Sequence, residues 1–249
     1  MLQPWRNGTV LRIEDETHNT RRFWIQVPEL DDFSFQPGQF VTLDLPIHEK
    51  ANKRWRSYSI ASWPDNSNTF ELIVLRLEDG AGTNYLFNEV TIGTTLPLRG
   101  PQGVFVLPPV LDRDLYLICT GTGVAPFRSM VQHIKTRGIE HRNIHLFYGC
   151  RTQKDLLYLN EFRQLEKELP GFQYHPTLSR ETWEGYTGYV HAHYEKVIHS
   201  QSTIDADGNK IVAPAYFLLC GWRNMIDEAR EKLLALGYDK KSIHQEIYG

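Results

Sequence analysis

The feature that most constrains the fold is a change of sequence pattern at Pro108-Pro109. Before these prolines, short apolar segments alternate with turn residues, which predicts a series of short β-strands. After them, apolar strand candidates alternate with helix candidates, a pattern typical of a parallel sheet covered by helices. With 249 residues, the chain is long enough for two domains. We therefore predict an antiparallel β-barrel domain over residues 1–109 and an α/β parallel-sheet domain over residues 110–249.

The predicted elements are separated by turn residues such as Pro37-Gly38 and Asp79-Gly80. In the barrel, strands are expected at residues 9–14, 21–27, 39–44, 58–62, 70–77 and 94–98, and a helix at 83–90. In the second domain, strands are expected at 115–119, 143–148, 172–178 and 216–220, and helices at 126–137, 156–169, 190–199 and 223–236. The polar segment 200–213, which contains Asp207-Gly208-Asn209, is expected to be an exposed loop.

Composition and charge argue against several classes of function. The net charge of −3 gives no reason to expect nucleic acid or an acidic membrane as a partner. No apolar run approaches the ~20 residues of a membrane helix, and the first residues lack the apolar region of a signal peptide, so a cytoplasmic location is expected. Cys119, Cys150 and Cys220 are too far apart to predict a zinc or iron–sulfur site, and reduced thiols are the simpler interpretation.

Arg56-Ser57-Tyr58-Ser59 places a cation, an aromatic ring and hydroxyl groups close together in the barrel domain. Arg56 can neutralise a phosphate by a bidentate contact, and Tyr58, on the same face of a strand, can lie against a flavin ring. The Ser59 hydroxyl can bond flavin N5. These residues suit FAD, and the alternative is an exposed strand in which Arg56 and Tyr58 form a surface cation–π pair.

Small residues at Ala81-Gly82-Thr83 lie at the start of the helix expected in the barrel domain. Backbone N–H groups at a helix N-terminus favour an anion such as a pyrophosphate. Thr83 is expected to be the N-cap residue, and helix capping without a ligand is the alternative interpretation.

The second domain has a glycine-rich turn, Gly121-Thr122-Gly123, directly after an apolar strand. Pro126 follows it and suits the first turn of a helix. Strand, glycine turn and helix form the geometry that holds a dinucleotide pyrophosphate at a helix N-terminus. Pro126 stands where the usual dinucleotide motif has its third glycine, and a tight turn without a ligand is the alternative.

Later strands of this domain end in further candidate residues. Ser179-Arg180 offers a hydroxyl and a guanidinium, which suit the 2′-phosphate that distinguishes NADP from NAD, and Tyr189 can stack on adenine. Cys220-Gly221 ends the last apolar strand and leaves room for a nicotinamide ring. An ordinary surface loop and an ordinary buried cysteine are the respective alternatives.

In this order, the motifs resemble those of the ferredoxin–NADP(+) reductase family, and the resemblance extends from about Gly8 to Tyr248. It implies an FAD-binding barrel followed by an NADP(H)-binding domain. It also implies a monomeric enzyme that passes electrons between NADP(H) and a carrier such as ferredoxin or flavodoxin. The similar segments are residues 56–62, 80–86, 121–129, 178–181 and 220–221.

The resemblance also gives roles to single residues. Family members often end in an aromatic residue over the flavin face, and Tyr248 in Glu246-Ile247-Tyr248 matches that ending, although Gly249 follows it. Hydride transfer is then expected near Ser59, Cys220 and Glu246, with Tyr248 as a lid, whereas a frayed tail is the alternative. Arg151, just after a strand, is expected to add a phosphate contact.

Other functions remain open at this point. The chain could be the reductase component of an oxygenase or a free-flavin or quinone reductase, and a non-catalytic flavin- or nucleotide-binding module is a further alternative. Lys50, Lys53, Arg54 and Arg56 form a basic cluster on which an acidic carrier protein could dock. A solvated loop beside a phosphate-binding arginine explains the same cluster.

Overall fold

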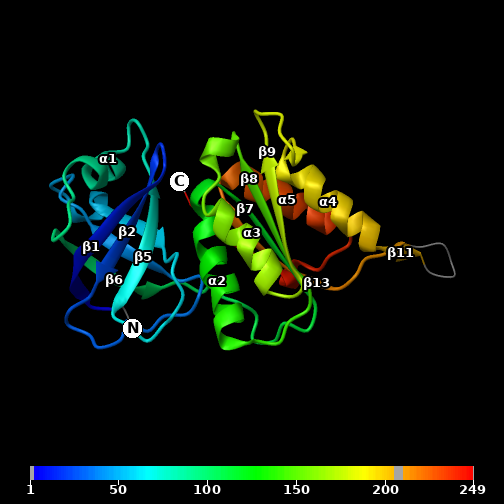
Figure 1. Cartoon of the computed structure of the whole chain (residues 1–249), viewed down its shortest axis with the longest axis horizontal. Coiled ribbons are helices and arrows are strands. Elements are labelled where there is room, and N and C mark those ends of the chain that lie inside the picture. The colour runs from blue at the N-terminus through cyan, green and yellow to red at the C-terminus, as the bar shows by residue number, and fades with distance from the viewer. Residues whose placement is uncertain (1–2, 205–209, 249) are drawn as a thin grey trace. The chain divides into compact units, whose positions relative to one another are not determined.

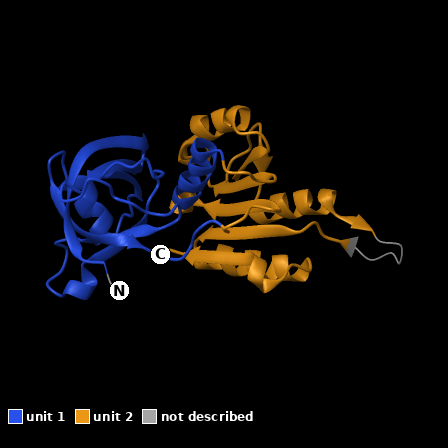
Figure 2. Cartoon of the chain, turned by 90° about the horizontal axis from the view of Figure 1, so that it is seen from below, with its two compact units in different colours: residues 1–107, 125–138 blue, residues 108–124, 139–249 orange. Residues whose placement is uncertain are grey.

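The computed structural model describes residues 3–204 and 210–248. The chain divides into two compact units (Figure 2). The first comprises residues 1–107 and 125–138, and the second comprises residues 108–124 and 139–249. The first segment of the first unit thus ends beside Pro108-Pro109. Residues 125–138, from the later part of the chain, are grouped with the barrel.

The first unit is built on a six-stranded antiparallel sheet with the strand order β4-β3-β6-β1-β2-β5 (Figure 1). The edge strands β4 and β5 are joined by an isolated bridge between Ile60 and Leu72, which closes the sheet into the predicted barrel. The strands are β1 (Trp5–Thr17), β2 (Thr20–Gln26), β3 (Phe40–Asp44), β4 (Trp55–Ser59), β5 (Thr69–Leu75) and β6 (Thr95–Gln102). The helices of this unit are η1 (Ala51–Lys53), α1 (Ala81–Asn88) and most of α2 (Val124–Arg137).

The barrel is held together by apolar side chains that alternate along its strands. Phe23 and Ile25 of β2, Val41 and Leu43 of β3, and Phe70 of β5 are all buried in one cluster. Residues two apart on a strand share a face, so this alternation directs one side of each strand inward.

The second unit is a parallel sheet with the order β10-β9-β8-β7-β13-β14. From β7 the chain proceeds outward to β8 and β9, whereas β13 and β14 lie on the other side of β7. The neighbouring ends of β7 and β13 therefore form the topological switch point, where open α/β sheets bind ligands. The strands are β7 (Asp114–Thr120), β8 (Ile144–Cys150), β9 (Phe172–Leu178), β10 (Tyr186–Thr187), β13 (Ala215–Gly221) and β14 (Ile243–Ile247).

Helices cover both faces of this sheet. Phe162 of α3 contacts Tyr174 of β9, while α4 and α5 share a buried cluster with Phe147 of β8 on the opposite face. The helical elements of the unit are η2 (Gly121–Gly123), η3 (Gln153–Asp155), α3 (Leu159–Glu168), α4 (Val190–Gln201), α5 (Arg223–Ala235) and η4 (Lys240–Ser242).

The structure corrects several element predictions. The strand expected at 58–62 is β4 and ends at Ser59, because the chain then leaves β3 and crosses to β5. Helix α3 begins at Leu159, after η3 and the left-handed residue Tyr158. The segment expected to be a loop carries a short hairpin, β11 (Thr203–Ile204) and β12 (Lys210–Ile211). Asp207-Gly208-Asn209 lies outside the described residues.

Candidate functional site

The candidate flavin motif lies on β4, at the edge of the barrel sheet. Arg56 and Tyr58 are partly buried, while Trp55 and Ser57 are exposed, so Arg56 and Tyr58 share one face as predicted. Tyr58 packs against the barrel core, and burial raises its pKa to about 12, although the neighbouring Arg56 lowers it. The Ser57 hydroxyl lies 3.1 Å from that of Thr42 on the opposite face. Tyr58 is therefore a neutral, well-supported ring.

Arg56 lies against the start of α1. A Cβ atom added to Gly82 would lie 3.0 Å from the Arg56 Cγ and 3.2 Å from its Nε, so the arginine packs tightly on this glycine and would have to shift if a larger residue stood there. The guanidinium donates to the backbone oxygens of Lys53 and Trp55 at 3.0 and 2.8 Å. A cation beside a helix N-terminus forms a cradle for an anionic group, and this arrangement fits the pyrophosphate of FAD.

The start of α1 differs from the prediction in one respect. The helix begins at Ala81 and its N-cap residue is Gly80, so Thr83 is the third helical residue and the N-cap prediction for it was wrong. The Thr83 hydroxyl donates to the Gly80 oxygen at 3.1 Å and accepts from the Leu77 N–H at 3.1 Å. The short Gly80-Ala81-Gly82 run allows this tight turn, and Thr83 fastens it.

The candidate dinucleotide turn lies at the switch point of the parallel sheet. Gly121–Gly123 forms a single turn of 3₁₀-helix between β7 and α2, so the helical backbone begins earlier than the predicted start at Pro126. Cys119 of β7 is in register with Cys220 of β13. A Cβ on Gly123 would clash with the Cys220 carbonyl oxygen, which shows how closely the glycine turn and the end of β13 approach each other.

This turn has polar groups that suit a nucleotide. Among the described residues, the buried Thr120 hydroxyl has no hydrogen-bond partner. Gly121 has a φ of +52°, the left-handed conformation that glycine adopts readily, and helix α2 follows. An unpaired hydroxyl and a close glycine turn before a helix fit the phosphates of a dinucleotide.

Tyr248 lies on the same turn. Its hydroxyl accepts a hydrogen bond from the Gly123 N–H at 3.2 Å and donates to the Thr120 carbonyl oxygen. Its ring centroid lies 5.5 Å from that of Trp222, a partner that the sequence did not suggest. Burial raises the pKa of Tyr248 well above its ordinary value. Because β14 pairs with β13 up to Ile247, the chain reaches Tyr248 as an ordered segment and not as a frayed tail.

Cys220 and Glu246 face each other across the β13–β14 pair. Burial raises the pKa of the Cys220 thiol, and the neighbouring Glu246 raises it further. Cys119 and Cys150 are also buried, and burial raises both of their pKa values, that of Cys150 to about 12. These thiols are protonated and unreactive, so Cys220 can contribute a small neutral surface to the site but no thiolate nucleophile.

The candidate 2′-phosphate residues Ser179 and Arg180 follow β9, and Arg180 lines a pocket there. The Ser179 N–H donates to the Cys150 oxygen at 3.0 Å, and the Arg180 N–H donates to the Arg151 oxygen at 2.9 Å. These bonds place the backbones of Arg151 and Arg180 side by side. A pocket of about 720 Å³ opens here, and it is lined by Thr152, Gln153, Lys154, Leu159, Arg180 and Glu181.

Sequence reasoning did not anticipate the groups that share this pocket with Arg180. Lys154 adds a second cation, whereas Glu181 accepts from the Gln153 N–H at 2.7 Å and adds a carboxylate. Their positions follow from η3, which is fixed by a capping box between Thr152 and Asp155. Tyr189 is three-quarters exposed beside α4, an accessible position that adenine stacking would need.

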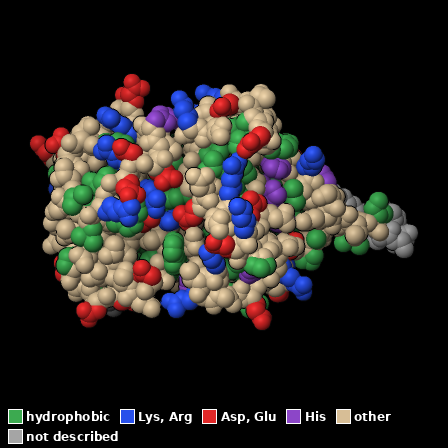
Figure 3. All heavy atoms as spheres, viewed as in Figure 1, with side chains coloured by type: hydrophobic (Ala, Val, Ile, Leu, Met, Phe, Trp, Pro, Cys, Tyr) green, Lys and Arg blue, Asp and Glu red, His purple; other side chains and the backbone are tan. Residues whose placement is uncertain are grey.

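The basic cluster near the flavin motif is partly neutralised. Arg54 donates two hydrogen bonds of 2.7 Å to Asp44, so its charge is paired, while Lys50 and Lys53 are exposed. On the face drawn in Figure 3, Lys and Arg side chains are interspersed with Asp and Glu side chains. Among the described residues, no helix has the length and apolar character needed to cross a membrane.

Comparison with known proteins identifies both halves of this arrangement. The Oxidoreductase FAD-binding domain family matches residues 7–107, and the Oxidoreductase NAD-binding domain family matches residues 117–231. The chain is 36% identical to ferredoxin–NADP reductase B of Sorangium cellulosum, over 87% of this chain and 86% of that protein. The chain belongs to the ferredoxin–NADP(+) reductase family. It is a flavoenzyme with an FAD-binding barrel and an NAD(P)-binding α/β domain.

This member of the ferredoxin–NADP(+) reductase family is also similar to parts of longer proteins. It is 34% identical to the electron transfer component of anthranilate 1,2-dioxygenase from Acinetobacter baylyi, over 72% of this chain but only 50% of that protein. The structure of a cytochrome P450 reductase from Amycolatopsis matches with a TM-score of 0.83 and 27% identity, over 98% of this chain and 70% of that one. The family thus includes reductases that serve different electron acceptors.

Proposed function

We propose that this protein is an NADP(H)-dependent FAD enzyme that exchanges electrons with a one-electron carrier such as ferredoxin or flavodoxin. The observation that carries the proposal is that one chain combines two arrangements that suit an anionic group. These are the cradle of Arg56 and Gly82 in the barrel and the glycine turn against Cys220 in the parallel sheet. The similarity to a ferredoxin–NADP reductase over most of both chains supports the choice of carrier.

In this proposal, Arg56 and the N-terminus of α1 bind the pyrophosphate of FAD. Tyr58 flanks the flavin ring, and Ser59 at the end of β4 lies toward flavin N5. When bound, FAD accepts a hydride and can release the two electrons one at a time. The flavin supplies the redox chemistry, so the protein's own contribution is to position the two cofactors and to exclude water.

The nucleotide half of the proposal gives a role to Tyr248. The glycine turn binds the pyrophosphate, and the nicotinamide lies near Cys220 and Glu246. The Tyr248 hydroxyl accepts the hydrogen bond of the Gly123 N–H, so this bond must break before the N–H can donate to a ligand atom. Tyr248 is therefore proposed to be a lid that leaves the glycine turn when the nucleotide binds.

The preference for NADP(H) depends on the pocket of Arg180. Its guanidinium can pair with a 2′-phosphate, whereas NADH has only a hydroxyl there. Glu181 in the same pocket opposes this preference, because a carboxylate repels a phosphate and can accept from a ribose hydroxyl. Arg151 and Lys154 add positive charge, so we propose that the cations prevail.

The first experiment is an anaerobic titration of the FAD-loaded protein with NADPH and with NADH, followed by flavin absorbance. NADPH should bleach the flavin at much lower concentrations than NADH. Arg180→Ala should raise the KM for NADPH about tenfold or more, the loss expected for a charged hydrogen bond, and should change the KM for NADH little.

Arg163→Ala is the matched control, because Arg163 is an exposed arginine on α3 paired with Glu184 at 2.8 Å. Equal effects of Arg180→Ala on both nucleotides would remove the 2′-phosphate role. A bound flavin that neither nucleotide reduces would overturn the proposed enzyme and favour a binding module.

A second candidate function is the reductase component of an oxygenase. The similarity to the anthranilate 1,2-dioxygenase electron transfer component favours it, although this chain spans only half of that protein. Steady-state rates with ferredoxin, flavodoxin, free flavin and quinone as acceptors would separate the two candidates. Rapid turnover with free flavin or quinone alone would favour a different acceptor class from the one proposed.

Docking of an acidic carrier is proposed for the loop that carries Lys50 and Lys53, because Arg54 is already paired with Asp44. Turnover with ferredoxin should then fall as ionic strength rises, and salt-independent turnover would argue against this surface. A monomeric state and a cytoplasmic location remain predictions, which sedimentation and cell fractionation would test.

A further inference from the structure

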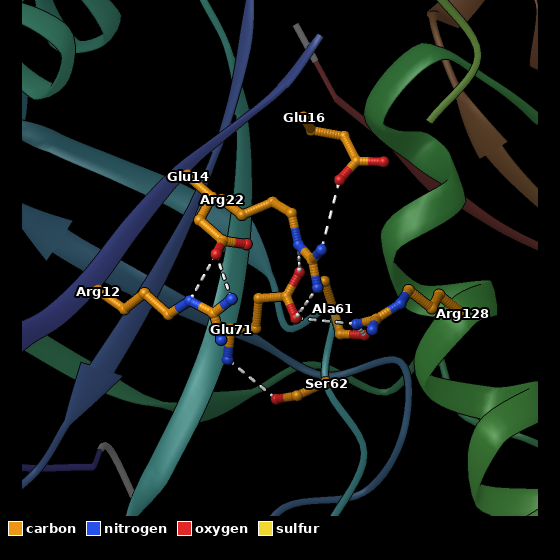
Figure 4. A network of polar contacts seen from close by, with 8 residues as sticks. All are labelled: Arg12, Glu14, Glu16, Arg22, Ala61, Ser62, Glu71 and Arg128. Carbon is orange, nitrogen blue, oxygen red and sulfur yellow. Dashed lines mark hydrogen bonds and ion pairs between the residues drawn. The ribbon is translucent and has the colours of Figure 1, made fainter. Parts of the chain in front are cut away.

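A buried carboxylate lies between two arginines in the barrel unit (Figure 4). Glu71 of β5 accepts from the Arg22 Nε at 2.7 Å and from its Nη2 at 3.0 Å. The Nη1 of Arg128, on α2, donates to the same carboxylate at 3.0 Å. The side chains of Glu71 and Arg128 are only 3% and 5% exposed. We call Glu71, Arg22 and Arg128 the seam cluster.

Buried charges are costly, so a cluster of this kind is weak evidence for extra stability. Moving ions out of water costs several kcal/mol each, and their mutual attraction returns this only with good geometry. What a buried ion pair does fix is the relative position of the segments that carry it. The seam cluster holds one particular segment of the barrel in this way.

That segment is Ala61-Ser62-Trp63, just after the flavin motif. The Ala61 N–H donates to the Glu71 backbone oxygen at 2.8 Å, and the Glu71 N–H donates to the Ser62 hydroxyl at 2.9 Å. Arg128 donates to the Ala61 oxygen at 2.9 Å, and its guanidinium lies 5.4 Å from the ring centre of Trp63. Every residue of the segment thus contacts Glu71 or Arg128.

The position of this segment in the barrel makes those contacts consequential. β4 is an edge strand that pairs only with β3 in the barrel sheet, and that pairing ends at Ser59 opposite Phe40. Directly afterwards the chain crosses to β5, where Ile60 bridges Leu72 and closes the barrel. One end of the flavin strand is therefore fixed by the bridge to β5 and by the contacts of Glu71 and Arg128, and not by continued pairing along a strand.

We propose that Glu71 and Arg128 are positioning residues for the flavin. They hold Ala61, which lies two residues after Ser59. In this way they set the direction in which the side chain and backbone of Ser59 face the flavin ring. This role rests on the proposed function, because it requires that the barrel binds FAD. Arg22 supports Glu71 through its two hydrogen bonds to the carboxylate.

The proposal is tested by replacing Glu71 in the FAD-loaded full chain. Glu71→Gln keeps the shape but removes the charge that both arginines share. We expect the dissociation constant of FAD to rise about tenfold or more, the size expected for a lost charged hydrogen bond. The flavin absorption band and the flavin midpoint potential should also shift, because the groups near the ring take new positions.

A second variant covers the case in which Glu71→Gln does not fold. Arg128→Lys keeps a cation near Glu71 but loses the planar fork that reaches both the carboxylate and the Ala61 oxygen. It should change FAD affinity and midpoint potential in the same direction. Glu14→Gln is the matched control, because Glu14 lies beside the cluster but forms an exposed pair with Arg12, and no bond drawn in Figure 4 joins it to Ala61, Ser62 or Glu71.

The outcomes separate a positioning role from a structural one. Variants that unfold more readily but, once folded, bind FAD with unchanged affinity and potential would overturn the proposal. Equal shifts in Glu14→Gln would also overturn it, because the effect would then follow surface charge. Wild-type protein that binds no FAD would overturn the proposed function, whereas wild-type and variant proteins that bind FAD alike would overturn only the role of the seam cluster.

Discussion

The flavin strand β4 and the dinucleotide turn Gly121–Gly123 are positioned in different ways. In the barrel sheet β4 is an edge strand that pairs with β3, and side-chain contacts hold it further: Arg56 of β4 lies against Gly82, and the seam cluster from other elements holds the segment that follows β4. The dinucleotide turn follows β7, which is paired on both sides by β8 and β13. Backbone pairing and the absence of a side chain on Gly123 define that turn.

This difference predicts different sensitivities in the two regions. A site set by side chains can be altered by removing one charged group while the backbone is left in place. A site set by close backbone approach is altered by adding a single carbon atom. We therefore expect Cβ additions to be most harmful at the dinucleotide turn and charge removals to be most harmful at the flavin strand.

The largest effect is expected for Gly123→Ala. The new Cβ would clash with the Cys220 carbonyl oxygen, so the glycine turn or the end of β13 must shift. Reduction of the bound flavin by NADPH should slow by about 100-fold, the loss that a misplacement of roughly 1 Å can cause. Stopped-flow absorbance measures this rate, and FAD content should stay normal.

Gly138→Ala is the control for this variant. Gly138 follows α2 with a φ of +60°, and an added Cβ would meet no atom within 4 Å. It should cost some stability through backbone strain but leave the reduction rate unchanged. A similar slowing in both variants would show that general destabilisation, and not the approach to Cys220, controls the rate.

The next largest effect is expected for Arg56→Ala. Loss of a charge-assisted contact with the FAD pyrophosphate should raise the dissociation constant of FAD by about 10- to 100-fold. Fluorescence titration of the FAD-free protein measures it. Arg56→Lys should be intermediate, because a lysine keeps the charge but lacks the bidentate geometry.

Arg54→Ala removes a neighbouring positive charge outside the cradle, since Arg54 is paired with Asp44. FAD affinity should change little. An equal loss in Arg54→Ala and Arg56→Ala would mean that the loop attracts FAD by its overall charge, and the side-chain cradle at Gly82 would lose its support.

The sequence predicted the two fold classes because each has a local signature. The barrel strands are short, apolar and separated by turn residues, and the second half alternates strands with helices. Arg56 and Tyr58 could be placed on one face because side chains two apart on a strand point the same way. The meeting of Gly123 with Cys220 follows from parallel strands whose carboxyl ends share an edge.

Other features have no local signature. Strand β14 carries the polar run His244-Gln245-Glu246 at a sheet edge, and its strand character comes from pairing with β13. The seam cluster joins residues from three distant elements, so nothing near Glu71 in the sequence identifies its partners. Thr83 has the residue type of an N-cap, but Gly80 takes that position because the preceding turn bonds to the Thr83 hydroxyl.

The smallest expected effect concerns the stability of the protein at acidic pH. Here the two whole units are compared, and not only the two sites. His145, His175 and His193 pack together in the second unit, with the His145 Nδ1 and the His175 Nε2 3.2 Å apart. Burial lowers the pKa of His145, and lowers those of His175 and His193 to about 3 and about 4. The neighbouring histidines lower the pKa of His175 further.

A histidine that stays neutral when folded destabilises the native state as the pH falls. Its pKa in the unfolded chain is about 6.5, so the unfolded state binds more protons below that pH. Stability is therefore full above about pH 6.5 and declines toward the folded pKa values, by at most about 1.4 kcal/mol per pH unit for each histidine. Hydrogen exchange at pH 7, 6 and 5, corrected for intrinsic rates, measures this in each unit.

Peptides from β8, β9 and α4 should lose protection more steeply on acidification than peptides from β2 and β5. His133 of α2 also has a pKa lowered by burial, but it stands apart from the three-histidine cluster. His175→Phe should flatten the acid dependence of the second unit, because it removes one proton-binding group and keeps a ring beside Phe147, 4.4 Å away. Identical slopes in the two units, or an unchanged slope in His175→Phe, would mean that the buried histidines do not set the acid limit of the α/β unit.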